Sequence, residues 1–263
     1  MPRVTIIETG LVSPKNRELH GSYPQMFEQM IGAADATVTF NTVGIPAGEP
    51  LPAIEGLEAI LITGSSAGVY DDFKWIAPLE EFVRAAHENH VPMVGVCFGH
   101  QLIAQALGGT VRKSEKGWGL GRHVYDVAPG NGLVEGARIA LACSHQDQVI
   151  TPPAGTKTIL SSDFTPHAGL LYAGDTTLSV QPHPEFSVGF ALACCEMAGK
   201  GDAPDGVVVP AKASLAEPLD SALLGGAIAR FLTRSSQSVF RAKWIPVRVT
   251  KTRQSKNLEQ GRR

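Results

Sequence analysis

The sequence has little cysteine and no long hydrophobic run, and each lack excludes a class of protein. Four cysteines among 263 residues are far too few for a disulfide-stabilised scaffold. No segment approaches the roughly 18 consecutive apolar residues of a membrane-spanning helix. The first residues also lack the apolar run and small-residue cleavage site of a signal peptide. We therefore expect a cytoplasmic protein with reduced thiols that binds no membrane.

A fixed glycine–proline period and a large net charge are missing as well. The 28 glycines and 18 prolines follow no regular spacing, which excludes collagen-like and low-complexity fibres. With 43% hydrophobic and 18% charged residues the chain can bury a core, so disorder of the whole chain is excluded. The formal net charge of −2 carries no signature of nucleic-acid binding, and we expect no nucleic-acid partner.

The charge is nevertheless unevenly distributed along the chain. The segment from Arg241 to Arg263 holds eight Lys or Arg and a single acidic residue, Glu259. The remainder holds 15 basic and 24 acidic residues, a net charge of −9. We predict one domain over residues 1–235 and a basic C-terminal tail over residues 236–263. A solubilising tail is the simpler interpretation, and docking of the tail on the acidic body or on a partner is the alternative.

Short apolar runs alternate with helical patterns through most of the sequence. A denser group of extended pieces joined by Gly-rich turns covers Thr110–Val149, and turn residues over Gly199–Pro218 predict a long loop. This alternation predicts an α/β protein with an open, mostly parallel central sheet, helices on both faces and a small antiparallel subsheet. The strands are predicted over Val4–Thr9, Ala36–Val43, Leu57–Thr63, Pro92–Val96 and Leu178–Gln181. The helices are predicted over residues 22–30, Trp75–Asn89, Gln101–Leu107, Phe186–Met197 and residues 221–232. Ser22 is the predicted N-cap of the first helix and Asp220 that of the last.

The segment VPMVGVCFGHQLIAQALGG, residues 91–109, carries a candidate nucleophile. It contains glycines two residues before and two residues after Cys97, placed between a predicted strand and a predicted helix. This is the pattern of a nucleophile elbow, in which the glycines allow a tight, strained turn. Cys97 would stand at a helix N-terminus, whose amide groups favour the thiolate. A buried structural cysteine is the alternative, which the flanking glycines disfavour.

His183 is the best candidate for a base that would activate this cysteine. It lies in LSVQPHPEF, where Pro184 favours an extended backbone at His183. Side chains two residues apart in extended chain point the same way, so Glu185 can orient the imidazole. Taken alone, His-Pro-Glu would be interpreted as a turn.

Metal-ligand spacing is not found. His87 and His90 have no third ligand placed near them, and Cys194 and Cys195 are adjacent rather than separated as zinc ligands are. The glycines of Gly117–Gly121 precede no helix pattern and make a poor nucleotide-binding loop. We expect neither a metal nor a cofactor.

With these residues in place, the sequence resembles the class I (triad) glutamine amidotransferases over about residues 4–235. The resemblance implies a flavodoxin-like, three-layer fold. It also implies a small-molecule substrate, glutamine or another γ-glutamyl compound. The matching motifs are GVCFGHQ (Gly95–Gln101), ALGG (Ala106–Gly109), SHQD (Ser144–Asp147), HPE (His183–Glu185) and the loop ITGSSAGVYD (Ile62–Asp71).

The resemblance also implies a role for each matching residue. Cys97 would attack the glutamine side-chain amide and form a γ-glutamyl thioester. His183 would transfer protons and Glu185 would orient it. The backbone N–H groups of Gly64 and Phe98 would form the oxyanion hole, and Gln101, Ser144 and His145 would hold the amino-acid end of glutamine. One departure is Gly64-Ser65, where the family commonly has two glycines.

The combination of motifs is most similar to the stand-alone branch of the family, which includes GMP-synthase-like amidotransferases and γ-glutamyl peptidases. We recognise no synthase domain in the sequence, so an ammonia-using synthase would be a separate subunit. Two enzymatic hypotheses stay open: a glutaminase that delivers ammonia to such a partner, and a self-sufficient γ-glutamyl peptidase. A non-catalytic binding or regulatory module is disfavoured by the complete Cys-His-Glu set.

Overall fold

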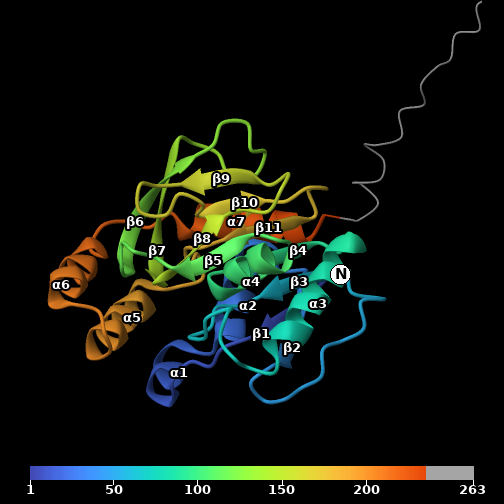
Figure 1. Cartoon of the computed structure of the whole chain (residues 1–263), viewed down its shortest axis with the longest axis horizontal. Helices are drawn as coiled ribbons and strands as arrows, with labels where there is room; N and C mark the ends of the chain where they lie inside the picture. The colour runs from blue at the N-terminus through green and yellow to red at the C-terminus, as the bar shows by residue number, and fades with distance from the viewer. Residues whose placement is uncertain (235–263) are drawn as a thin grey trace, which may run out of the picture.

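The computed structural model describes residues 1–234, and the predicted basic tail over residues 236–263 lies outside the described residues. Within residues 1–234, nine strands form one central sheet (Figure 1). They are β1 (Arg3–Glu8), β2 (Thr39–Gly44), β3 (Ala59–Ile62), β4 (Met93–Val96), β6 (Gly119–Val127), β7 (Arg138–His145), β9 (Lys157–Ser161), β10 (Gly169–Leu171) and β11 (Thr177–Val180).

The strand order is β2-β1-β3-β4-β11-β10-β9-β6-β7. Neighbouring strands from β2 to β11 pair in parallel, and those from β11 to β7 pair antiparallel. A separate two-stranded antiparallel sheet joins β5 (Thr110–Lys113) to β8 (Asp147–Thr151). The predicted α/β class is confirmed, including the small antiparallel subsheet. The carboxyl ends of the parallel strands β1, β3 and β4 meet at one edge, where open α/β sheets place their sites.

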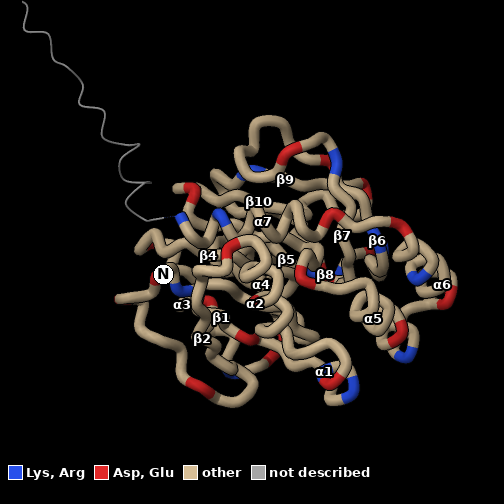
Figure 2. Tube along the Cα trace, turned by 180° about the vertical axis from the view of Figure 1, so that it is seen from behind, with Lys and Arg blue, Asp and Glu red and all other residues tan. Residues whose placement is uncertain are grey.

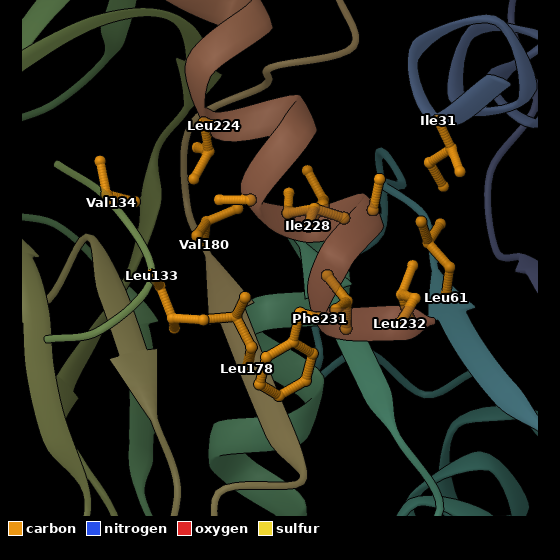
Figure 3. Packing of buried hydrophobic residues seen from close by; sticks show 14 of the residues in the cluster. Ile31, Leu61, Leu133, Val134, Leu178, Val180, Leu224, Ile228, Phe231 and Leu232 are labelled. Atoms are coloured by element: carbon orange, nitrogen blue, oxygen red, sulfur yellow. The ribbon is translucent and has the colours of Figure 1, made fainter. Parts of the chain in front are cut away.

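Helices cover both faces of the sheet because strand side chains alternate between two apolar layers. Ile60 and Ile62 of β3 pack with α3 (Ile76–Glu88) and α4 (Phe98–Ala106), whereas Leu61 packs with α2 (Tyr23–Ala34) and α7 (Ser221–Leu232). Figure 3 shows this second layer, in which Phe231 of α7 lies beside Leu178 of β11 and Leu232 of α7 lies near Leu61 of β3. The remaining helices are α1 (Pro14–His20), α5 (Val188–Lys200) and α6 (Asp205–Ser214).

The two predicted N-caps behave differently. Ser22 caps α2 with a reciprocal capping box, in which its hydroxyl accepts from the Gln25 N–H and the Gln25 side chain accepts from the Ser22 N–H. Asp220 does precede α7, but its carboxylate accepts from the backbone N–H of Ala140 at 2.8 Å instead of from its own helix. Asp220 therefore fastens the start of α7 to β7.

The predicted long loop over Gly199–Pro218 is wrong, because its middle forms the helix α6. Proline within the sequence pattern argued for a loop, and Pro210 does lie inside this helix. Tertiary packing outweighs that penalty: α6 presses so closely on β6 that a Cβ at Gly121 would come within 2.4 Å of the Ala211 carbonyl oxygen. The short helix α1 also has no counterpart in the sequence prediction, and α4 begins three residues before the predicted Gln101.

Charged residues of both signs are interspersed on the outer helices α1, α5 and α6, as Figure 2 shows. This mixed pattern forms no basic face on these helices. No helix within residues 1–234 is long and apolar enough to cross a membrane.

Candidate active site

Cys97 occupies the turn between β4 and α4 in a strained backbone conformation. Its φ of 54° and ψ of −103° lie outside the conformations that non-glycine residues ordinarily adopt. The turn is held at both ends, since the Cys97 N–H donates to the Val180 carbonyl at 2.9 Å and the Gln101 N–H donates to the Cys97 carbonyl at 3.0 Å. Such strain held by the surrounding structure is typical of functional residues.

The glycines on either side of Cys97 are required by packing. A Cβ at Gly95 would lie 2.4 Å from the Gly99 carbonyl oxygen, and a Cβ at Gly99 would lie 2.4 Å from the Ile62 carbonyl oxygen. Both distances are shorter than any side chain tolerates. Strand, turn and helix can approach this closely only with glycine at both positions, which brings Cys97 to the carboxyl edge of the sheet.

His183 and Glu185 form a buried hydrogen-bonded pair. The Nδ1–H of His183 donates to Glu185 Oε1 at 2.7 Å, because the carboxylate can only accept. The backbone is fixed by a bond of 2.8 Å from the His183 N–H to the Ala142 carbonyl of β7. The Cys97 side chain lies beside the same ring, because both lie within 4 Å of the position that a Cβ at Gly64 would occupy; Nε2 is the ring nitrogen left to face the sulfur. The structure thus brings Cys97, His183 and Glu185 into one chain of contacts.

The surroundings of His183 favour its charged form. Burial lowers the pKa of the imidazole, but the Glu185 carboxylate and the Cys97 sulfur act in the opposite direction and together raise the pKa above its ordinary value. A cationic imidazole beside a sulfur is the arrangement that activates cysteine nucleophiles.

Phe186 lies flat against the His183 ring. Their ring centroids are 3.8 Å apart and their planes differ by 10°. Phe186 is stacked in turn on Tyr23 at 6.4 Å and meets Phe190 edge-on at 4.6 Å. Glu185 therefore fixes one edge of the imidazole and Phe186 fixes its face.

Gly64 lies directly opposite the Cys97–His183 pair. A Cβ at this position would lie 3.2 Å from His183 Cε1 and 3.8 Å from Cys97 Cβ, so a side chain would enter the space where a substrate must react. The Gly64 carbonyl points into the protein and accepts from the hydroxyls of Thr9 and Thr63 at 3.2 and 3.0 Å. Among residues 1–234, the Gly64 and Phe98 N–H groups have no hydrogen-bond acceptor.

The predicted site residues surround one cleft of about 550 Å3. Cys97, Gly64 and His183 line it, whereas Glu185 does not and is buried against His183. The Phe98 side chain is fully buried beside Trp75, so only its backbone can face a substrate. The other lining residues that the sequence had singled out are Gln101, Ser144 and His145.

Gln101 offers an acceptor to the cleft. Its side-chain nitrogen donates to the Asp147 carbonyl at 3.0 Å and to Gln181 Oε1 at 3.1 Å, which uses both of its hydrogens. The oxygen Oε1 is what remains for a ligand, and it suits an ammonium group.

Ser144 and His145 have local partners in the structure. Burial lowers the pKa of His145 to about 3, and its neutral ring donates from Nδ1 to the Asp147 carbonyl at 3.0 Å. Ser144 and Cys194, a second cysteine, both line the cleft and lie close enough to interact. Burial above all raises the pKa of Cys194, which distinguishes it from an activated thiol.

Two sets of contacts cross the rim of the cleft. The Tyr70 hydroxyl donates to Asp147 Oδ1 at 2.9 Å and so joins the loop that follows Gly64 to β8. On the other side Asp202 accepts from Trp118 Nε1 at 2.8 Å and lies 3.9 Å from Lys113 Nζ.

Sequence reasoning did not single out Tyr23 or Phe186, which line the cleft. Phe186 directly follows the His-Pro-Glu motif and Asp147 ends the SHQD motif, so adjacency to a motif was the available signal. Tyr23 and Met197 carry no such signal, because only the tertiary fold brings α2 and α5 to the cleft. Within the described part of the chain, no three His, Cys, Asp or Glu side chains are grouped as metal ligands.

Comparison with known proteins gives a family match. Residues 18–191 match the model of the family described as glutamine amidotransferase class-I. A glutamine amidotransferase-like protein of Schizosaccharomyces pombe is 33% identical over 150 residues, which cover 56% of this chain and 59% of the yeast protein. Gamma-glutamyl peptidase 4 of Arabidopsis thaliana is 29% identical over 65% of this chain and 70% of its own length. A glutamine-hydrolyzing GMP synthase subunit of Saccharolobus solfataricus is 29% identical over 54% of this chain and 74% of its own length.

Solved structures share the fold. A glutamine amidotransferase of Methylobacillus flagellatus superimposes with a TM-score of 0.69 at 19% identity, covering 88% of this chain and 94% of that one. The structure of a glutamine amidotransferase from Thermotoga maritima gives a TM-score of 0.66 at 18% identity, covering 88% of this chain and 98% of that one. The family model matches well over half of the chain, and the matched residues include Cys97, His183 and Glu185. The chain is therefore an enzyme that belongs to the class I glutamine amidotransferase family.

Proposed function

We propose that the enzyme hydrolyses the side-chain amide of glutamine, or of a related γ-glutamyl compound, through a thioester on Cys97. The observation that carries this proposal is the contact chain from Cys97 to His183 to Glu185, which starts at a strained turn and ends in a buried 2.7 Å hydrogen bond. A structural cysteine would need neither the strain nor the oriented imidazole.

The first half of the reaction acylates the sulfur. The Cys97 thiolate attacks the γ-carbonyl carbon, a C–S bond forms, and negative charge moves to the carbonyl oxygen. The N–H groups of Gly64 and Phe98 stabilise that charge, an effect worth about 3 kcal/mol for one such donor. His183 then gives its Nε2 proton to the amide nitrogen, the C–N bond breaks, and ammonia or an amine leaves.

The second half releases glutamate. His183 takes a proton from a water molecule, whose oxygen attacks the thioester carbon, and the C–S bond breaks to restore the thiolate. Glu185 holds the imidazole in the tautomer that both halves require. Gln101 Oε1 accepts from the substrate α-ammonium, and the segment around Ser144 and His145 holds the rest of the amino-acid end.

A separate synthase protein that takes up the ammonia is supported by the relative described as a glutamine-hydrolyzing GMP synthase subunit. A second candidate function, a self-sufficient γ-glutamyl peptidase, is supported by the size of the cleft. At about 550 Å3 it lies within the range of roughly 300–1,000 Å3 typical of sites for drug-sized ligands, which are much larger than glutamine. The relative named gamma-glutamyl peptidase 4 supports it as well.

Glutamate release by the full chain tests the proposed chemistry. We expect release from glutamine or from a small γ-glutamyl amide, and a fall in rate of at least about a thousandfold in Cys97→Ala. Cys195→Ala is the matched control, because Cys195 is another buried cysteine that does not line the cleft. Equal rates in Cys97→Ala and the parent chain would overturn the proposal, as would the absence of glutamate from every γ-glutamyl substrate.

A further inference from the structure

Several apolar and aromatic side chains are among the residues that line the cleft. Phe186, Ala198 and Cys194 belong to one packed cluster, against which Tyr23 and Trp118 also pack. Met197 precedes Ala198 on α5 and lines the same cleft with 42% of its surface exposed. We call Tyr23, Trp118, Phe186, Met197 and Ala198 the apolar wall.

The apolar wall begins beside the residue that is assigned to the leaving group. His183 is the residue that protonates the departing nitrogen, so any substituent on that nitrogen starts beside its ring. Phe186 is stacked on that ring at 3.8 Å and Tyr23 is stacked on Phe186 at 6.4 Å. Of the groups assigned to the glutamyl half, Gln101 comes from α4, which contributes no residue to the wall. The segment around Ser144 belongs to β7 and borders the wall, since His145 pairs with Gly119 next to Trp118.

The charged groups beside the wall are already paired. Asp202 accepts from Trp118 Nε1 at 2.8 Å and lies 3.9 Å from Lys113 Nζ, so Trp118 is held in place as a rigid face. The Asn16 side-chain nitrogen lies 3.3 Å from the Met197 sulfur. A charged leaving group would have to compete with these contacts, whereas an apolar one would cover the exposed surface of Met197 and remove it from water.

On the basis of the proposed function, we propose that the apolar wall is a leaving-group subsite for amines with an apolar, preferably aromatic, substituent. The preferred substrates are then γ-glutamyl amides of such amines rather than glutamine. The chemistry is unchanged: the amide C–N bond breaks as the thioester forms, and the amine leaves with the proton from His183. Phe186 is already covered by neighbouring rings, whereas the half-buried rings of Tyr23 and Trp118 line the cleft and can contact an aromatic substituent.

Two synthetic amides that differ by one phenyl group test this subsite. The purified full chain is given γ-glutamyl-phenethylamide, γ-glutamyl-ethylamide and glutamine separately, and glutamate release is measured. We expect kcat/KM for the phenethylamide to exceed that for the ethylamide by about tenfold or more. In Met197→Ala that ratio should fall by about threefold to tenfold. Leu223→Ala removes a similarly exposed apolar side chain, 41% exposed, on α7 away from the cleft, and should keep the parent ratio.

The outcomes separate the subsite from the chemistry. If both amides release glutamate with equal kcat/KM, the proposed subsite is wrong. The glutamate release itself would still support the proposed function. Hydrolysis of glutamine alone would also overturn the subsite, and would indicate that the apolar wall faces an ammonia-using partner. No glutamate from any of the three would contradict the proposed function and the subsite together.

Discussion

The imidazole of His183 is stacked on the ring of Phe186 with 3.8 Å between centroids and 10° between planes. Glu185 fixes the ring at Nδ1 with its 2.7 Å hydrogen bond, but one hydrogen bond leaves rotation about its own axis open. The stack removes that freedom. Phe186 therefore acts as a positioning residue for the base.

Phe186→Leu tests this positioning. Leucine keeps apolar bulk but loses the flat face, so we expect kcat to fall about tenfold because the base is no longer aligned. KM should change less. Phe190→Leu is the control, since Phe190 touches Phe186 edge-on at 4.6 Å and makes no stack with His183. Both variants should lose about 1 kcal/mol of stability, so equal loss of kcat in the two would show that packing alone is responsible.

Removal of His183 and neutralisation of Glu185 should have unequal effects. His183→Ala removes the proton carrier, and we expect kcat to fall by about 10,000-fold. Glu185→Gln keeps the imidazole but weakens its orientation, and we expect a fall of about a hundredfold to a thousandfold. Steady-state kinetics with thermal unfolding of each variant measures both. A folded His183→Ala variant that retains activity would contradict the assignment of the base.

His100 should make the free energy of unfolding depend on pH. Burial lowers its pKa to about 3, and its Nδ1 pairs with the Ser179 hydroxyl at 2.7 Å. The unfolded chain binds a proton at His100 near pH 6.5 and the folded chain does not, so stability is lost as the pH falls from about 6.5 toward 3. Between about pH 6 and 4 this contributes a slope of about 1.4 kcal/mol per pH unit.

His100→Gln removes that contribution. As the pH falls from about 6 to 4, its free energy of unfolding should decrease less steeply than that of the parent chain, by about 1.4 kcal/mol per pH unit. Urea unfolding of both proteins at several pH values measures the difference. Parallel curves for the two proteins between about pH 6 and 4 would show that His100 does not titrate as its burial requires.

The Tyr70–Asp147 hydrogen bond should act on substrate binding. It joins the loop after Gly64 to β8 at 2.9 Å, and the half-exposed ring contributes little to folding. In Tyr70→Phe we expect KM to rise about threefold to tenfold, with kcat within about twofold, since one such bond contributes about 0.5–1.5 kcal/mol. Phe73→Ala alters another half-exposed aromatic of the same segment and should leave KM unchanged. A rise in KM with both variants would attribute the effect to general loosening of the loop.

The sequence was most informative where a short segment specifies its own structure. The strand, turn and helix around Cys97 follow from local signals, because the glycines at 95 and 99 are needed by contacts within and beside that turn. The motif at His183 also places Glu185 within reach of the ring, although through a turn at Pro184 and Glu185 and not through the extended chain that the sequence predicted. The alternation of strands and helices was enough to predict the α/β class.

The sequence was least informative where distant segments meet. The contact of Gly64 with His183 joins β3 to the segment after β11, and the apolar wall combines α2, the start of β6 and α5. Hydrophobic patterns reveal that such side chains are buried, but not what they face. The helix α6 was missed for a related reason, because its packing on β6 outweighs the effect of Pro210.

The most direct test of the central claim is covalent labelling with 6-diazo-5-oxonorleucine, a reactive analogue of glutamine, followed by peptide mass spectrometry. Two cysteines line the cleft, and burial above all raises the pKa of Cys194, so only Cys97 beside His183 is set up to react. We predict one label per chain, on Cys97, with loss of activity in proportion to labelling and protection by a γ-glutamyl substrate. Labelling of Cys194 or another cysteine while Cys97 stays unmodified would contradict the assignment of the nucleophile.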